Sequence, residues 1–387
     1  MPSFKYELEV LTPLHVGSGK KIYPLEYVID GDFIRVDMDK LFTDSAFQME
    51  RFILESKKRD FYLGNFDKKN AIKHPLYKLD MDTQVGQELI SNIGSPSALI
   101  LDFIKEGKNF YIPGSSIKGA IRTAILWQAL GNKENKRDFE KQLKHTIEKK
   151  KEERRAKSRS RVKREQFALS AEETILGKPN YSLLRALQVG DSAYLRLSSL
   201  NIIYTKVLGK FGHGFKWKQL GRERKSVDRP EEATSTFLEA VRPKTLIFGT
   251  LKIDDFLLQK EVAATLGFKG AELIANIAKV CNEFSLHHLE KEIVFFQSMG
   301  FLSIQKELEK IKALNLEENA LLLHFAWGAG YGTKALGEDI DSELFENMRK
   351  EQLMPQGWQG SSPKTRKIVF EGKVPRYVIG WVKMKLM

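Results

Sequence analysis

Three glycines at alternate positions, Gly328, Gly330 and Gly332, stand directly before Thr333 and Lys334 in the segment HFAWGAGYGTKALG. Glycines let the backbone approach an anion closely, and the amides of such a turn can form a nest for phosphate oxygens. The spacing is neither a Walker loop, which needs GxxxxGK followed by Ser or Thr, nor GxGxxG. Two interpretations stay open, namely phosphate contact and a structural turn after a buried strand.

The segment IPGSSIKGAIR is a second candidate anion site, because an aromatic strand stops at its Pro-Gly and an apolar-periodic helix follows. Ser115 and Ser116 are natural N-cap residues there. The first turn of that helix would offer free amides, two hydroxyls and Lys118, with Gly119 beside it and Arg122 one turn later. The alternative is a capped helix start with solvated cations.

A third candidate is LTPLHVGSGKK, where a strand opens into His15, Gly17, Ser18, Gly19 and Lys20. The histidine could act as a general acid or base. No second histidine or carboxylate is paired with it in the sequence. A hydrogen-bonded loop residue is therefore the competing interpretation of His15.

The segment FGHGFKWKQ combines Trp217 with Lys216 and Lys218 in an expected protruding loop, which suits stacking between bases. A solvated loop with one anchoring tryptophan is an equally good interpretation. His213 of this loop and His15 are the two histidines placed where they could reach a substrate.

The sequence contains no convincing metal set, because His287 and His288 are adjacent and would point about 100 degrees apart on a helix. Cys281 lies in a helix-like apolar run and is expected to be a packing residue. We expect neither a metal ion nor another cofactor.

Charge points to a polyanionic partner. The 387 residues include 63 Lys and Arg against 50 Asp and Glu, a net charge of +13. Such an excess attracts nucleic acid or acidic lipid, although a solvating surface would look similar. No stretch approaches the roughly 18 apolar residues of a membrane helix, and the N-terminus lacks a secretory signal. A cytoplasmic protein that does not span a membrane is expected.

Strand and helix patterns alternate in both halves of the chain, without the long parallel-strand pattern of a doubly wound sheet. Paired βαββαβ units fit best, which predicts an α+β fold. Residues 132–165 interrupt this pattern with fifteen Lys or Arg against seven Asp or Glu. They are expected to form a solvated helix or a disordered insertion.

The chain contains, in this order, the motifs LTPLHVGSGKKIYPLEYVID, IPGSSIKGAIRTAIL, LQVGDS, LEAVRPKTLIFGTLKI and WGAGYGTK. Together they resemble the RAMP superfamily of CRISPR proteins. Within it the chain looks most like the family of the fifth subunit of the type III-A Csm complex.

The resemblance implies two modified ferredoxin-like, RRM-like domains. We expect one over residues 1–190 with the basic insertion 132–165, and one over 191–387 with a helical insertion at 254–314 and the glycine-rich loop at 328–334. It also implies a non-catalytic subunit that caps the 3′ end of the guide RNA (crRNA) and supports its maturation in antiviral defence. The implied partners are the neighbouring backbone subunit, the other Csm subunits, target RNA and a trimming nuclease.

The family's glycine-rich loop corresponds to Gly328, Gly330 and Gly332, and its Ser-Ser-Ile-Lys-Gly turn to residues 115–119. The chain lacks the aromatic octapeptide with which an RRM reads bases, so backbone and shape contacts are expected to dominate. The expected RNA contacts are His15, Gly17, Ser18, Lys20, Ser115, Ser116, Lys118, Gly119, Arg122, Trp217, Gly328, Gly330, Gly332, Thr333 and Lys334.

Three alternatives remain. Some RAMP proteins resemble metal-independent endoribonucleases that process guide precursors, which would need a general base such as His15 or His213. A nucleotide-dependent enzyme could use the glycine-rich loop through Lys334. A purely structural adaptor would leave the RNA to its neighbours.

Overall fold

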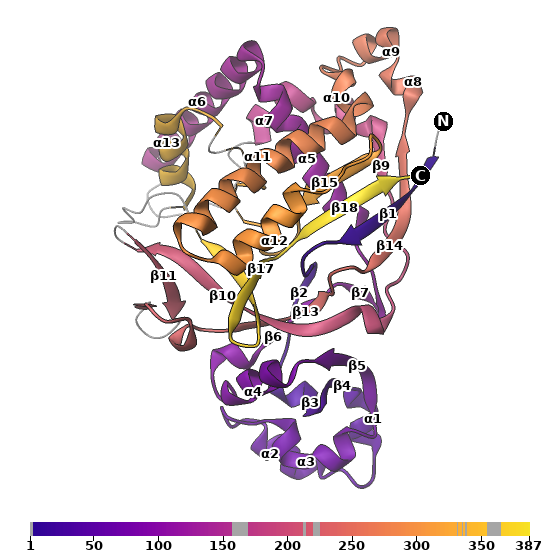
Figure 1. The fold of residues 1–387 in the computed structure, drawn as a ribbon, viewed down its shortest axis with the longest axis vertical. Helices are drawn as coiled ribbons and strands as arrows, with labels where there is room; N and C mark the ends of the chain where they lie inside the picture. The colour runs from indigo at the N-terminus through magenta and orange to yellow at the C-terminus, as the bar shows by residue number, and fades with distance from the viewer. Residues whose placement is uncertain are drawn as a thin grey trace.

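The computed structural model describes residues 3–156, 169–211, 214–219, 225–330, 332–334, 336, 339–353 and 365–387. Helices and strands alternate along this part of the chain, and the strands form two main sheets and one short hairpin (Figure 1). The expected α+β class is confirmed. None of the described helices has the length and apolar content needed to cross a membrane.

The smaller sheet is antiparallel and has β1 at its centre. Tyr6, Leu8 and Val10 are buried while Glu7 and Glu9 between them are only half-buried, as the alternation in FKYELEV requires of a strand with one covered face. In spatial order its strands are β15 (Ala320–His324), β18 (Trp381–Leu386), β1 (Ser3–Val10), β14 (Leu246–Ile253) and β9 (Leu187–Val189).

The larger sheet is organised around the long strand β10, which pairs with β13, β11, β16 and β5. Its main path is β2 (Gly17–Ile22), β6 (Ile100–Phe103), β13 (Thr236–Val241), β10 (Leu200–Phe211), β5 (Pro75–Met81), β4 (Asp32–Val36) and β3 (Tyr27–Asp30). Off this path lie β11 (Gly214–Gln219), β12 (Lys225–Val227), β16 (Arg366–Glu371) and β17 (Val374–Val378). The separate hairpin is β7 (Lys105–Glu106) with β8 (Asn109–Phe110).

Both sheets combine strands from either side of residue 190. In the smaller sheet β1 lies between β14 and β18, and in the larger one β6 pairs in parallel with β13. A boundary at residues 190 and 191 therefore does not separate the sheets, because the pairing that builds them is long-range. The number of domains stays a prediction.

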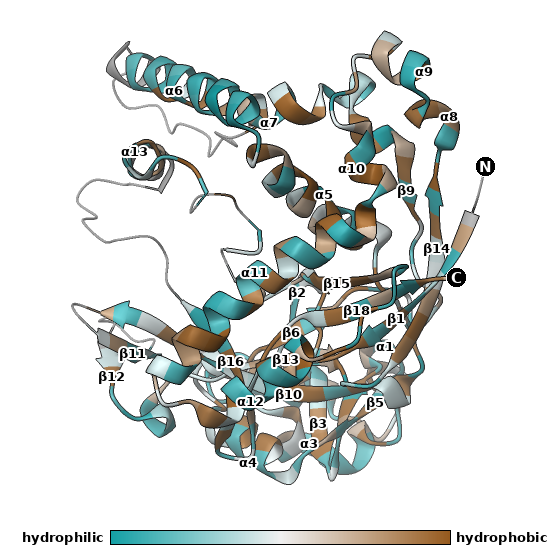
Figure 2. Ribbon diagram, turned by 45° about the horizontal axis from the view of Figure 1, so that its top comes forward, coloured by the Kyte–Doolittle hydropathy of each residue, from teal (hydrophilic) through white to brown (hydrophobic). Residues whose placement is uncertain are grey.

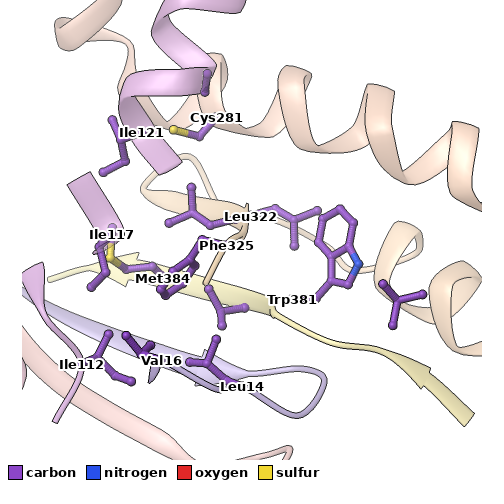
Figure 3. Close-up of a cluster of buried hydrophobic side chains, with 14 of the residues drawn as sticks. Leu14, Val16, Ile112, Ile117, Ile121, Cys281, Leu322, Phe325, Trp381 and Met384 are labelled. Carbon is purple, nitrogen blue, oxygen red and sulfur yellow. The ribbon is translucent and has the colours of Figure 1, made fainter. Parts of the chain in front are cut away.

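Helices α5 (Gly114–Leu130) and α11 (Ile277–Ser298) pack against β15 of the smaller sheet, and α12 (Leu302–Lys312) packs against α11 and β17. In Figure 3, Ile121 of α5 and Cys281 of α11 lie above Leu322, Met384 and Trp381 of the sheet. The thiol is fully buried, and burial raises its pKa. Cys281 is thus a packing residue, as its apolar run predicts.

A small lobe protrudes at the bottom of Figure 1 and has its own core, which includes Val28, Ile34, Leu41 and Phe52. It joins the larger sheet through the short parallel pairing of β5 with β10. Besides β3, β4 and β5 it contains α1 (Met38–Thr43), α2 (Met49–Glu55), α3 (Leu63–Ala71) and α4 (Thr83–Ser91).

Most of the basic insertion forms the long helix α6 (Lys133–Ala156), while residues 157–165 lie outside the described residues. Figure 2 shows that α6 is mainly hydrophilic, and over its residues 133–152, for which burial is described, only Phe139, Leu143 and Ile147 are buried. These side chains face α7 (Leu169–Leu176) and α13 (Ser342–Leu353). The remaining helices, α8 (Asp255–Leu258), α9 (Lys260–Thr265) and α10 (Ala271–Ala275), precede α11.

Candidate RNA interface

The glycine-rich segment follows β15 in a turn that depends on glycine. Gly328 has φ of +88°, and a Cβ added there would lie 2.4 Å from Cγ2 of Ile379. Gly330 has φ of +96°, but nothing lies within 4 Å of its Cβ position. Gly328 is therefore required by both conformation and space, whereas Gly330 borders open space.

The glycine amides of this segment lack a backbone acceptor within the part of the chain that the structure describes. Gly328, Gly330 and Gly332 donate no backbone hydrogen bond to another described residue. Thr333 is different, because its side chain is buried and its Oγ1 donates to the carbonyl oxygen of Ala329 at 2.9 Å. The hydroxyl expected to meet RNA thus holds the turn, while the glycine amides remain open to an anion.

Three lysines surround these amides. Lys334 belongs to the segment itself, Lys367 comes from β16 and Lys210 from β10, and the last two line one cleft with Gly330. None of them pairs with a carboxylate of a described residue. The positive charge at this site is therefore not neutralised within the described part of the chain.

Lys367 is the most perturbed of these cations. Burial lowers its pKa to about 8, and the charges of Lys334 and Lys218 add to the effect. Its ammonium lies 4.0 Å from the ring centroid of Trp327, a cation–π contact. Burial also lowers the pKa of Lys334. An incoming phosphate would stabilise the charged form of both side chains.

His15 is hydrogen-bonded to the residue that precedes Gly328 in this turn. Its side chain is 1% exposed, and Nδ1 donates to the carbonyl oxygen of Glu239 at 2.7 Å. The carbonyl oxygen of His15 in turn accepts a 3.0 Å bond from the amide of Trp327. Burial lowers the pKa of His15 to about 4. Because the ring is almost fully buried and hydrogen-bonded within the protein, the loop-residue interpretation describes His15 better than contact or catalysis.

Gly17, Ser18 and Lys20 lie on β2, an edge strand of the larger sheet. Gly17 and Lys20 are exposed. The hydroxyl of Ser18 donates to Oδ2 of Asp102 at 2.6 Å. Of this group, Gly17 and Lys20 remain free to meet a ligand.

The N-terminus of α5 is not capped by the serines that the sequence suggested. The N-cap position is Pro113, and the amide of Gly114 donates to Oδ1 of Asp191 at 2.8 Å. The prediction that Ser115 and Ser116 cap the helix was wrong, because the acceptor arrives from the distant LQVGDS segment. The carboxylate of Asp191 also occupies an amide that was expected to face phosphate.

The two cations of this helix are engaged within the protein. Nζ of Lys118 donates to the carbonyl oxygen of Leu187 at 2.7 Å, and burial lowers its pKa. Arg122 forms an ion pair with Glu172. Ser115 and Gly119 are exposed and Ser116 is half-buried. Only the small residues of this turn are left for contact with RNA.

Trp217 is a packing residue of β11. Its side chain is 4% exposed, and its ring lies 5.5 Å from that of Phe370 and 5.9 Å from that of Phe301, centroid to centroid. A ring buried on both sides cannot stack on bases, so the anchoring interpretation holds. His213 lies outside the described residues.

The glycine-rich segment and the His15 segment are joined by the hydrogen bond from the amide of Trp327 to the carbonyl oxygen of His15. The IPGSSIKGAIR segment shares the hydrophobic core in Figure 3 with them. Sequence reasoning missed Lys210, Lys367, His288 and His324, which line the cleft beside the glycines. No local signal marks them, because only strand pairing and the packing of α11 bring them there. In the described ranges, no three metal-ligating side chains could hold a metal ion.

The model of the RAMP superfamily matches residues 7–333 of the chain. The chain therefore belongs to the RAMP superfamily, as its motifs predicted.

Two curated relatives carry the name CRISPR system Cms protein Csm5. The protein of Streptococcus thermophilus is 31% identical over 135 residues, which cover 32% of this chain and 38% of that relative. The protein of Methanocaldococcus jannaschii is 23% identical over an alignment that covers 100% of this chain and 89% of that relative. The second similarity extends over the whole chain.

Two solved structures are similar in fold. A chain of the Csm–crRNA–target RNA ternary complex of a type III-A CRISPR-Cas system has a TM-score of 0.66 at 19% identity, covering 99% of this chain and 100% of that one. The crystal structure of T. onnurineus Csm5 has a TM-score of 0.62 at 18% identity, covering 97% and 99%. At these identities the similarity concerns the fold.

Proposed function

We propose that this chain is a non-catalytic, crRNA-binding subunit of a type III-A CRISPR Csm effector complex. In this role it caps the 3′ end of the crRNA and supports crRNA maturation and antiviral defence. The Csm5 names of its relatives support this assignment, as does the fold shared with a chain of a Csm–crRNA–target RNA complex.

One observation carries the RNA-binding part of the proposal. Glycine amides that make no backbone hydrogen bond to a described residue lie beside Lys334, Lys367 and Lys210, which have no acidic partner among those residues either. Amides and ammonium groups bind phosphate oxygens without reading the base. That suits a guide whose sequence varies from one complex to the next.

The partners follow from the same assignment. We infer contacts with the neighbouring backbone RAMP subunit and the other Csm subunits, and proximity to target RNA and a trimming nuclease. The exposed residues of β2, Gly17 and Lys20, extend the proposed RNA surface beyond the glycine-rich turn.

The test is RNA binding by a charge-removing pair of substitutions. Lys334→Ala with Lys367→Ala should weaken binding of single-stranded RNA by about tenfold or more, since charge-assisted contacts to phosphate are lost. Lys385→Ala is the matched control, because Lys385 pairs with Glu317 at 2.6 Å on the smaller sheet. Unchanged affinity in the double variant, measured by fluorescence anisotropy at low salt, would contradict the proposal.

The alternative is a metal-independent endoribonuclease. A general base must be accessible and titrate near the working pH, whereas His15 is buried with its pKa lowered to about 4. We therefore expect no specific cleavage when the purified chain is incubated with precursor RNA. Cleavage that disappears in His15→Ala would replace the binding-only assignment with a catalytic one.

A further inference from the structure

The glycine-rich segment forms one wall of a cleft of about 270 Å³. The other walls come from α11, from β10 and β11, and from β16. Sites for small ligands begin at about 300 Å³. The cleft lies at the lower limit of this range, so the largest ligand to consider is one monomer of a chain-like molecule and not a folded partner.

Two buried histidines of this cleft have an unused ring nitrogen. His288 on α11 and His324 on β15 are each 5% exposed. Among the residues that the structure describes, Nε2 of His288 and Nδ1 of His324 have no hydrogen-bond partner. Buried polar atoms are nearly always paired in folded proteins. Both residues line the same cleft, so a ligand bound there would find hydrogen-bond partners at these two rings.

The chemistry of His324 is fixed by its surroundings. Nε2 lies 2.9 Å from the carbonyl oxygen of Ile379, and since a carbonyl only accepts, Nε2 carries the proton. Burial lowers the pKa of the ring to about 3, so it is neutral and Nδ1 is an acceptor. The ring is stacked on Trp381 at 4.2 Å, which holds its orientation. The ligand must therefore offer a donor such as a hydroxyl group.

The mouth and sides of the cleft add two further requirements. Lys210 and Lys367 favour an anion there. Phe215 and Phe295 supply an aromatic wall, with ring centroids 4.8 Å apart. An anion, hydroxyl donors and an apolar ring surface are together the features of a ribonucleotide.

Arg366 does not add to the anion site. Its guanidinium donates to both carboxylate oxygens of Glu292, at 2.6 and 3.2 Å, and lies 3.9 Å from the ring centroid of Phe295. The ion pair neutralises this charge, so the flat guanidinium extends the aromatic wall.

We propose that this cleft receives the 3′-terminal ribonucleotide of the bound RNA, with a phosphate at Lys210 and Lys367 and the ribose hydroxyls at His288 and His324. An internal ribonucleotide has one free ribose hydroxyl, whereas a terminal one has two on neighbouring carbons, which matches two unpaired ring nitrogens. The inference rests on the proposed RNA-binding function and assigns recognition of a free 3′ end to this chain.

The first test changes only the RNA. The full chain is titrated with short single-stranded RNAs that end in a free diol, a 2′-deoxy sugar, a 3′-deoxy sugar or a 3′-phosphate. The free diol should bind about tenfold more tightly than the other ends, because each modified end leaves a buried ring nitrogen unpaired. An RNA with one internal 2′-deoxy sugar is the control and should bind like the unmodified RNA.

The second test changes only the protein. His324→Phe keeps a ring over Trp381 but removes one acceptor, so it should bind the diol and one of the two deoxy ends with similar affinity, while His288 still discriminates against the other deoxy end. His74→Gln is the control, because His74 lies in the small lobe, where its Nε2 is 2.7 Å from Asp44, and this variant should still prefer the diol. Thermal melting checks that both variants are folded.

The outcomes separate this inference from the function on which it rests. RNA binding by the unmodified chain with equal affinity for all four ends would overturn the terminal-nucleotide inference and leave the proposed function standing. An effect of the internal 2′-deoxy sugar alone would overturn it too. No binding of any RNA would instead overturn the proposed function.

Discussion

Lys367 holds a positive charge where its surroundings favour the neutral amine. Its pKa of about 8 reflects burial and the neighbouring Lys334 and Lys218. Phosphate binding would raise that pKa, so above pH 8 the chain must take up a proton when it binds RNA. RNA affinity should therefore fall as pH rises through about 8.

The measurement is the dissociation constant between about pH 7 and about pH 9.5, with Lys367→Arg as the comparison, because arginine keeps its charge throughout. The arginine variant should give a flatter profile. The free energy of unfolding should change in the opposite direction to RNA affinity. The pKa of Lys367 is about 8 in the folded chain and 10.5 in the unfolded chain, so the unfolded chain binds more protons between these values and stability rises with pH above about 8. Parallel profiles for both proteins would contradict this account of Lys367.

His288 and His324 should make the fold sensitive to acid. Burial lowers the pKa of each to about 3, from an ordinary value of 6.5. Between these values the unfolded chain binds protons that the folded chain does not, so the free energy of unfolding decreases as pH falls from 6.5 towards 3. Each ring contributes up to ~1.4 kcal/mol per pH unit.

The check is urea unfolding of the chain and of His324→Gln at pH 7 and about pH 5. The variant should lose less stability on acidification, because glutamine does not titrate. An equal loss in both proteins would assign the acid sensitivity to other groups.

At the scale of elements, the turn after β15 predicts different effects for two similar substitutions. Both Gly328→Ala and Gly330→Ala place a side chain at positive φ, which costs about 1–2 kcal/mol. Only Gly328→Ala also brings a Cβ to 2.4 Å from Ile379. Thermal melting should show the larger loss for Gly328→Ala, and equal melting temperatures would mean that the turn adjusts to remove the clash.

Elements whose signals are local could be predicted from the sequence. The helix after the Pro-Gly of IPGSSIKG begins at Gly114, because an apolar period of three to four residues follows a strand-ending turn. Its cap could not be predicted, since Asp191 reaches it from another strand region. The base-stacking interpretation of Trp217 could not be excluded from the sequence for a related reason. A glycine-rich, charged stretch does not reveal that its one tryptophan packs inward.

The candidate site was predictable to the same extent. The glycines predict a turn because of their own conformational freedom. Lys367 and His324 come close to this turn only through the pairing of β16 with β10 and of β15 with β18. A single sequence contains no local trace of such pairing. Composition nevertheless indicated the kind of partner, because an excess of lysine and arginine acts over the whole surface.

At the scale of the molecule, the net charge of +13 predicts a steep salt dependence of RNA binding. Each phosphate neutralised on single-stranded RNA contributes about 0.7 to the slope of log affinity against log salt concentration. Removing Lys334 and Lys367 together should reduce that slope by up to about 1.4. Titrations at four or more salt concentrations would check this, and an unchanged slope would place the phosphates elsewhere.

Because β1 lies between β14 and β18, it can complete its pairing only after β18 has been synthesised. Residues 3–10 leave the ribosome long before their neighbour at residues 381–386, which is synthesised about 370 residues later. At about 5–20 residues per second, roughly 20–80 s pass between the two events. During that interval the edge of β1 facing β18 has no partner, so nascent chains should depend on chaperones, and ribosome stalling before Trp381 should leave products that aggregate.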